Sequence, residues 1–219
     1  MINQKVDPCD SGMPFKPSST KPRLGFFGGS FDPIHDGHLS VALSAVKKFE
    51  LQQVLLCPAY FAPLRQEKPF FSSNHRLAMV EAACQKHSHL EVFDDEILSG
   101  KTLFTYNTLL EVNNKFPEHE IFLMIGDDQY DKFEKWKFHQ NILNEFQIIV
   151  FNRNNIANGK DFSKKFPSAR IHRLENPLFP HSSTEIRKCI ETGKDISHLI
   201  PSPVYSHMKE SNLLDSHSL

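Results

Sequence analysis

The stretch GFFGGSFDPIHDGH, from Gly25 to His38, decides the fold that this sequence predicts. An apolar run ends at the glycine pair Gly28 and Gly29, and two histidines, His35 and His38, then open an amphipathic segment. This order predicts a strand, a glycine-bearing loop and a helix. Free backbone N–H groups and the positive end of the helix dipole converge at such a junction, so it favours phosphate binding.

The rest of the chain predicts an α/β protein. We expect further strands over 53–57, 90–93, 120–125, 146–151 and 169–174, and helices over 37–49, 74–86, 106–116, 138–145 and 185–192, with a last helix from about 203. The strongest strands are apolar throughout, which indicates a Rossmann-like, doubly wound parallel sheet with helices on both faces. The loops 28–37, 58–73, 126–136 and 151–155 follow strands, so they should share the rim where such sheets bind ligands.

Composition excludes several classes of protein. A net charge of −1 over 219 residues argues against a nucleic-acid binder. No apolar run is long enough for a membrane span, and the four cysteines form no CxxC pair, so we expect a cytoplasmic protein without a protein-bound metal. We predict a flexible arm over 1–22, one domain over 23–214 and a tail over 215–219.

The histidine pair leaves more than one interpretation open. His35 and His38 could be metal ligands, a turn cap or contacts to an anion, and their place at a helix start favours the anion. A second helix start, His181 to Arg187 (HSSTEIR), is either an ordinary N-terminal cap or another phosphate cradle.

These two stretches carry a family resemblance. GGSFDPIHDGH resembles the (H/T)xGH signature of the nucleotidylyltransferase superfamily, and HSSTEIR is similar to its ISSTxIR element. Within the superfamily, residues 23–214 resemble the bacterial nicotinate-nucleotide adenylyltransferases. The supporting features are IGDDQ (125–129), Lys135-Trp136, FTYNT (104–108), Arg153 and Leu199-Ile200-Pro201.

The resemblance implies adenylyl transfer from ATP to nicotinate mononucleotide, with Mg²⁺ accompanying ATP. It implies catalytic roles for His35, His38 and Arg187. The implied ATP contacts are Gly28, Gly29, Ser30, Phe31, Gly37, Ser182, Ser183 and Thr184, and the implied mononucleotide contacts are Arg65, Thr105, Asp128, Trp136 and Arg153. Trp136 could instead be a core residue, and Asp128 could cap the next helix.

Two departures from the family pattern concern the acceptor. Asn107 stands where the family has an aspartate, and the loop element Ala62-Pro63-Leu64-Arg65 lacks the family's histidine. The alternatives are therefore the same chemistry on nicotinamide mononucleotide or phosphopantetheine, or a non-catalytic nucleotide-binding protein of the same fold. The sequence leaves the preference for acid or amide open, and also the choice between monomer and homodimer.

Overall fold

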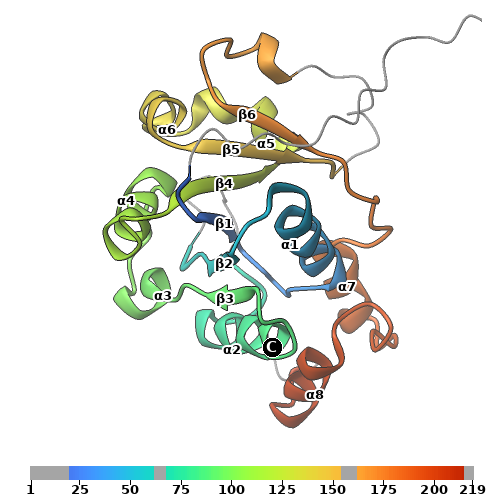
Figure 1. Cartoon of the computed structure of the whole chain (residues 1–219). Helices are drawn as coiled ribbons and strands as arrows, with labels where there is room; N and C mark the ends of the chain where they lie inside the picture. Colours follow the sequence, from blue (N-terminus) through green and yellow to red (C-terminus); the bar gives the residue numbers. More distant parts are fainter. Residues whose placement is uncertain (1–19, 62–67, 154–161, 215–219) are drawn as a thin grey trace, which may run out of the picture.

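The computed structural model describes residues 20–61, 68–153 and 162–214, and these form a six-stranded parallel sheet. The strands are β1 (Arg23–Gly29), β2 (Gln53–Pro58), β3 (Leu90–Val92), β4 (Glu120–Gly126), β5 (Gln147–Phe151) and β6 (Ile171–Leu174). Their order is β3-β2-β1-β4-β5-β6 (Figure 1). The direction of winding reverses between β1 and β4, which is the switch point at which doubly wound sheets bind ligands.

Helices cover both faces of the sheet. They are α1 (Asp36–Phe49), α2 (Ser73–Cys84), α3 (Asp95–Ser99), α4 (Thr105–Lys115), α5 (Asp127–Asp131), α6 (His139–Glu145), α7 (Ser183–Glu191) and α8 (Ser202–Glu210), with 3₁₀ turns η1 (Phe133–Lys135) and η3 (Phe162–Lys164). In Figure 1, α1, α7 and α8 lie on one side of the strands, whereas α4 and α6 lie on the other. The predicted doubly wound α/β architecture is therefore confirmed.

The continuous apolar strands follow from this two-sided burial. Successive strand residues point to opposite faces. In β4, Phe122 and Met124 join the core beneath α1, α2, α7 and α8, whereas Ile121, Leu123 and Ile125 join the core beneath α4 and α6. All five are buried. The strand therefore shows no polar alternation, because neither face meets water.

The structure contains short helical elements that the sequence did not predict. Helices α3 and α5 and the turn η1 fall in segments for which we predicted no helix, because five residues or fewer give no readable helical period. Most of the predicted arm and tail, and Arg65 in the β2–α2 loop, lie outside the described residues. No helix in the described ranges is both long and apolar enough to cross a membrane.

Candidate active site

The two histidines cap helix α1 reciprocally. His35 is the N-cap, and its Nδ1 accepts the backbone N–H of Gly37 at 3.1 Å. The His38 Nδ1 accepts the backbone N–H of His35 at 3.2 Å, and the two ring centroids are 3.8 Å apart. This is a capping box in which imidazoles replace the usual Ser and Glu. The turn-cap interpretation of the pair is therefore confirmed.

The cap also sets the protonation of both rings. Because each Nδ1 accepts a backbone N–H, each neutral ring carries its proton on Nε2. Burial, followed by the charges of Arg153 and His181, lowers the pKa of His35 to about 4. Burial, His35 and Arg153 lower the pKa of His38 well below its usual value. At neutral pH the pair offers two uncharged N–H donors and no Nδ1 lone pair for a metal.

Aromatic side chains support these rings. The Phe31 ring packs edge-on against His38, with centroids 5.1 Å apart, and the Phe179 ring lies nearly parallel to His35 at 6.3 Å. Phe31 is 2% exposed, so any contact with ATP there would come from its backbone. Phe179 is 39% exposed and borders the histidine pair on the solvent side.

Glycine at position 37 makes room for this arrangement. A Cβ atom on Gly37 would lie 2.8 Å from the His35 Cε1 and 2.9 Å from the Phe179 Cγ. Such distances are shorter than real Cβ contacts, so a side chain here would displace the rings. At Gly29 an added Cβ would press on the Phe31 ring at 3.1 Å, whereas at Gly28 it would meet Phe26 at 3.3 Å.

The second motif begins helix α7 with an ordinary capping box. The Ser182 Oγ accepts the backbone N–H of Glu185 at 3.3 Å, and the Ser182 N–H donates to the Glu185 carboxylate at 2.7 Å. The cap interpretation of Ser182 is therefore confirmed. It leaves the hydroxyls of Ser183 and Thr184 outside the cap.

Helix α7 is tied to the β1–α1 loop. The Ser183 hydroxyl donates to the Pro33 carbonyl at 2.9 Å. The Arg187 guanidinium donates to the Asp32 carbonyl at 2.7 Å and to the Thr184 hydroxyl at 3.1 Å. Arg187 and Asp32 are 155 positions apart in the sequence. The fold thus brings the two predicted phosphate motifs to one rim of the sheet.

Two predicted mononucleotide contacts pair with each other at the end of β4. The Arg153 Nη1 lies 3.3 Å from the Asp128 Oδ2. The neighbouring Asp127 carboxylate accepts the backbone N–H groups of both residues, at 2.9 and 3.2 Å. The predicted alternative for Asp128, a helix cap, is wrong, because α5 has no side-chain cap. Arg153 also lowers the pKa of both histidines, so its charge acts on the start of α1 as well.

The residues predicted to frame the pyridine lie at the ends of short elements. Thr105 begins α4, and Trp136 follows η1. The Trp136 ring packs against Phe133, with centroids 5.2 Å apart, and is half-buried at the edge of the core. Core packing therefore accounts for part of the indole surface. Asn107 is exposed in the first turn of α4.

Two buried charged side chains beside the rim, Asp32 and Arg76, were not predicted from the sequence. Arg76 is fully buried and Asp32 is 1% exposed. The sequence does contain one sign that Arg76 is unusual. Arg76 shares helical spacing with Met79, Val80 and Ala83, all of which are buried, so a charged side chain stands on an apolar helix face.

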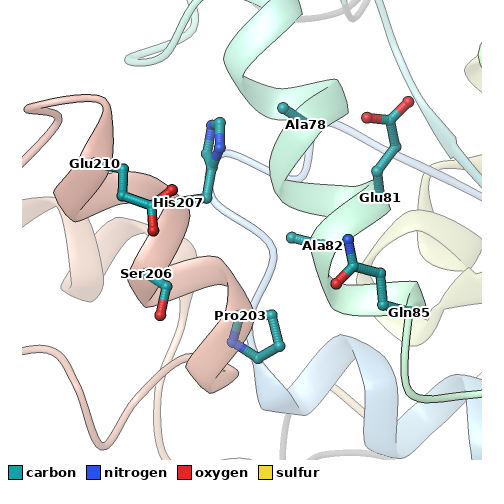
Figure 2. Close-up of a pocket in the computed structure, with 8 residues that line it drawn as sticks. All are labelled: Ala78, Glu81, Ala82, Gln85, Pro203, Ser206, His207 and Glu210. Carbon is teal, nitrogen blue, oxygen red and sulfur yellow. The ribbon is translucent and has the colours of Figure 1, made fainter.

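Two further observations limit what the described residues can bind. No group of three or more His, Cys, Asp or Glu side chains in ranges 20–61, 68–153 and 162–214 could hold a metal ion. A groove of about 370 Å³ lies between α2 and α8, and Figure 2 shows the side chains that line it. None of these groove residues is among the predicted substrate contacts.

Known proteins match both the sequence and the fold. The cytidylyltransferase-like family model matches residues 26–189, which places the chain in the class of cytidylyltransferase-like nucleotidyltransferases. A probable nicotinate-nucleotide adenylyltransferase of Christiangramia forsetii is 33% identical over 190 residues, which cover 87% of this chain and 97% of the relative. One of Methylacidiphilum infernorum is 30% identical over 197 residues, covering 89% and 93%. The chain belongs to the nicotinate-nucleotide adenylyltransferase family.

Solved structures share the fold. Nicotinic acid mononucleotide adenylyltransferase of Plasmodium falciparum, complexed with NaAD, aligns with a TM-score of 0.67 at 20% identity, covering 88% of this chain and 97% of the other. A putative nicotinate-nucleotide adenylyltransferase of Vibrio parahaemolyticus aligns with a TM-score of 0.63 at 22% identity, covering 85% and 99%.

Proposed function

We propose that this protein transfers the adenylyl group of ATP to nicotinate mononucleotide, giving nicotinate adenine dinucleotide and pyrophosphate, a step of NAD biosynthesis. The observation that carries the proposal is the joining of the two phosphate motifs. Arg187 and Ser183 of α7 bond to Asp32 and Pro33 of the β1–α1 loop, beside the histidine pair. The choice of substrates is supported by the relatives, which are named as probable nicotinate-nucleotide adenylyltransferases.

The reaction needs no protein nucleophile. A phosphate oxygen of the mononucleotide attacks the α-phosphorus of ATP, a new P–O bond forms, and the bond to the bridging β-phosphate oxygen breaks. The attacking group is already an anion, so catalysis consists of alignment and stabilisation of developing charge. The Nε2–H groups of His35 and His38 donate to phosphate oxygens of ATP. Arg187 compensates the charge on the leaving pyrophosphate.

The remaining candidates bind the two substrates. Backbone N–H groups of Gly28, Gly29, Ser30 and Phe31, and those that begin α7, surround the ATP phosphates. The N–H of Gly37 binds the His35 ring, so Gly37 contributes by leaving room for that ring. Arg153 attracts the mononucleotide phosphate and Asp128 accepts from ribose hydroxyls. Trp136 and Thr105 frame the pyridine, because a flat aromatic ring packs well on an indole face. Arg65 adds a second positive charge for the mononucleotide.

The magnesium ion belongs to the substrate, which is MgATP. Mg²⁺ prefers oxygen ligands, keeps several waters and binds phosphate oxygens in nucleotide enzymes. We also propose a cytoplasmic location, because Cys57, Cys84 and Cys189 are free thiols.

One assay tests the proposal. The full chain is incubated with ATP, Mg²⁺ and one acceptor at a time: nicotinate mononucleotide, nicotinamide mononucleotide or 4′-phosphopantetheine. Pyrophosphate release and the dinucleotide product are then measured. We expect release with the two pyridine mononucleotides and the higher kcat/KM with the acid. The proposal would be overturned if only phosphopantetheine gave pyrophosphate release, or if none of the three acceptors did.

A further inference from the structure

Two charged side chains, Asp32 and Arg76, are buried beside the site without being among its predicted substrate contacts. Burying a charge is costly unless hydrogen bonds replace the lost water. A chain that retains two such charges needs the contacts they make. The contacts described below lie on the β1–α1 loop, on the ends of the β2–α2 loop and on helix α7, which carry the proposed substrate contacts.

Arg76, on helix α2, binds four backbone carbonyls. Its Nη1 donates to Ser30 at 2.8 Å and to Ala59 at 2.6 Å, its Nη2 to Tyr60 at 2.9 Å, and its Nε to Phe71 at 3.3 Å. Ser30 belongs to the β1–α1 loop, whereas the other three carbonyls lie at the two ends of the β2–α2 loop. One guanidinium therefore joins both loops.

Asp32 is part of the β1–α1 loop and binds the end of the β2–α2 loop. Its two carboxylate oxygens accept the backbone N–H groups of Phe70 and Phe71, each at 2.9 Å. The same carboxylate lies 3.7 Å from the Arg187 guanidinium, whose Nη1 also bonds to the Asp32 carbonyl. Asp32 thus connects helix α7 to the end of the β2–α2 loop.

A third buried side chain completes the anchoring. Glu96 of α3 accepts the backbone N–H of Tyr60 at 3.0 Å and is 5% exposed. The β2–α2 loop is consequently fixed where it begins, at 59–60, and where it ends, at 70–71. Between these anchors the chain carries Arg65, a proposed mononucleotide contact that lies outside the described residues.

We infer that Asp32 and Arg76 are positioning residues for adenylyl transfer: they hold the β1–α1 loop, the two ends of the β2–α2 loop and Arg187 in fixed relative positions. This inference rests on the proposed function. Neither side chain touches a substrate. Asp32 acts through Arg187 and through the backbone of Phe70 and Phe71, and Arg76 acts through the carbonyls that it binds at the ends of the two loops.

The test for Asp32 is a double-mutant cycle. Asp32→Asn keeps the size of the side chain but removes its charge and one of its two acceptor oxygens. Because misplacing a reacting group by about 1 Å can cost about 10²-fold, we expect kcat to fall by about that factor. The losses caused by Asp32→Asn and Arg187→Met should multiply only in part, because Asp32 also holds the backbone of Phe70 and Phe71. Losses that multiply in full would overturn a role through Arg187.

A matched control separates this effect from the general loss of a carboxylate. Asp195 also accepts a backbone N–H, that of Ser197 at 2.9 Å, and its exposed turn lies outside the site. Asp195→Asn should keep kcat within twofold of the wild type. Rates are normalised to the folded fraction, measured by circular dichroism. If Asp32→Asn loses activity only in proportion to unfolded protein, the inference is wrong.

A variant of Arg76 tests the inference independently. Arg76→Lys keeps the positive charge but cannot reach four carbonyls, so we expect lower kcat with normal far-UV dichroism. Arg170→Lys is the control, because Arg170 binds the exposed carbonyls of Asn144 and Glu145. Wild-type rates in a folded Arg76→Lys variant would overturn the inference. Failure of the wild type itself to release pyrophosphate would instead reject the proposed function.

Discussion

At the scale of single residues, the cap of helix α1 fixes which nitrogen of each histidine can donate a hydrogen bond. The Nδ1 atom of each imidazole accepts a hydrogen bond from a backbone N–H. Each ring therefore presents Nε2–H as a neutral donor, and among the described residues no group accepts from it. A neutral donor can gain strength as negative charge develops on a phosphate oxygen, which is the requirement for transition-state stabilisation.

His38→Ala should lower kcat for pyrophosphate release by about 10²–10³-fold, the usual cost of losing such a donor. His198→Ala is the control, because that side chain is 67% exposed and lies outside the site. Both variants are assayed with ATP and nicotinate mononucleotide at saturation. A His38→Ala enzyme within a few-fold of the wild type would show that this ring does not contact the transition state.

Trp136→Ala should chiefly raise the KM for the pyridine nucleotide, because stacking acts equally on the ground state and the transition state. The KM for ATP should hardly change. Trp136→Phe keeps an aromatic face and should retain most of the affinity. Since Trp136 also packs on Phe133, the free energy of unfolding is measured in parallel. A stability loss with an unchanged KM would assign the ring to the core alone.

At the scale of elements, the predicted strands and long helices agree with the structure because their patterns are strong. In β4 the apolar run is uninterrupted, since both faces are covered. The elements α3 and α5 give no comparable pattern, being only five residues long. The roles of Asp32 and Arg76 could not be predicted, because their partners are backbone groups distant in sequence.

Gly37→Ala tests how closely helix α1 and its cap are coupled. Alanine favours a helix interior over glycine by about 0.5–1 kcal/mol, but here its Cβ would collide with the His35 ring. We expect kcat/KM for ATP to fall about tenfold while the free energy of unfolding changes by less than about 1 kcal/mol. Ser40→Ala, on the same helix, should change neither. Unchanged kinetics in Gly37→Ala would mean that the ring position is not critical.

At the scale of the whole molecule, the site depends on the order of the strands. Winding outward from β1 in both directions places the carboxyl ends of β1, β2, β4 and β5 at one rim. The chain then returns across the sheet to set α7 beside the first loop. Since the site is assembled from both ends of the domain, its protonation is linked to global unfolding.

That linkage predicts how stability depends on pH. The His35 pKa is about 4 in the folded protein against an ordinary 6.5, so the unfolded chain binds more protons between these values. Its contribution to stability is therefore complete above pH 6.5 and is lost as the pH falls toward 4. By pH 5 the loss is about 2 kcal/mol, at about 1.4 kcal/mol per pH unit over 1.5 units.

Glu96 acts in the opposite direction and hides this effect in the wild type. Burial raises its pKa from 4.5 to about 7, so its contribution is complete below pH 4.5 and is lost as the pH rises toward 7. The two groups oppose each other between about pH 4.5 and pH 6.5. The wild-type curve alone therefore cannot reveal the contribution of His35.

His35→Asn removes this contribution and keeps the cap, because asparagine is a good N-cap whose oxygen can still accept the Gly37 N–H. The free energy of unfolding is measured by urea titration at pH 8 and pH 5 for both proteins. We expect the wild type to lose about 2 kcal/mol relative to the variant between these two pH values. Parallel curves would mean that His35 titrates near 6.5 in the folded protein. The capped, neutral donor assigned to this ring would then be wrong, and the electrostatics of the ATP site with it.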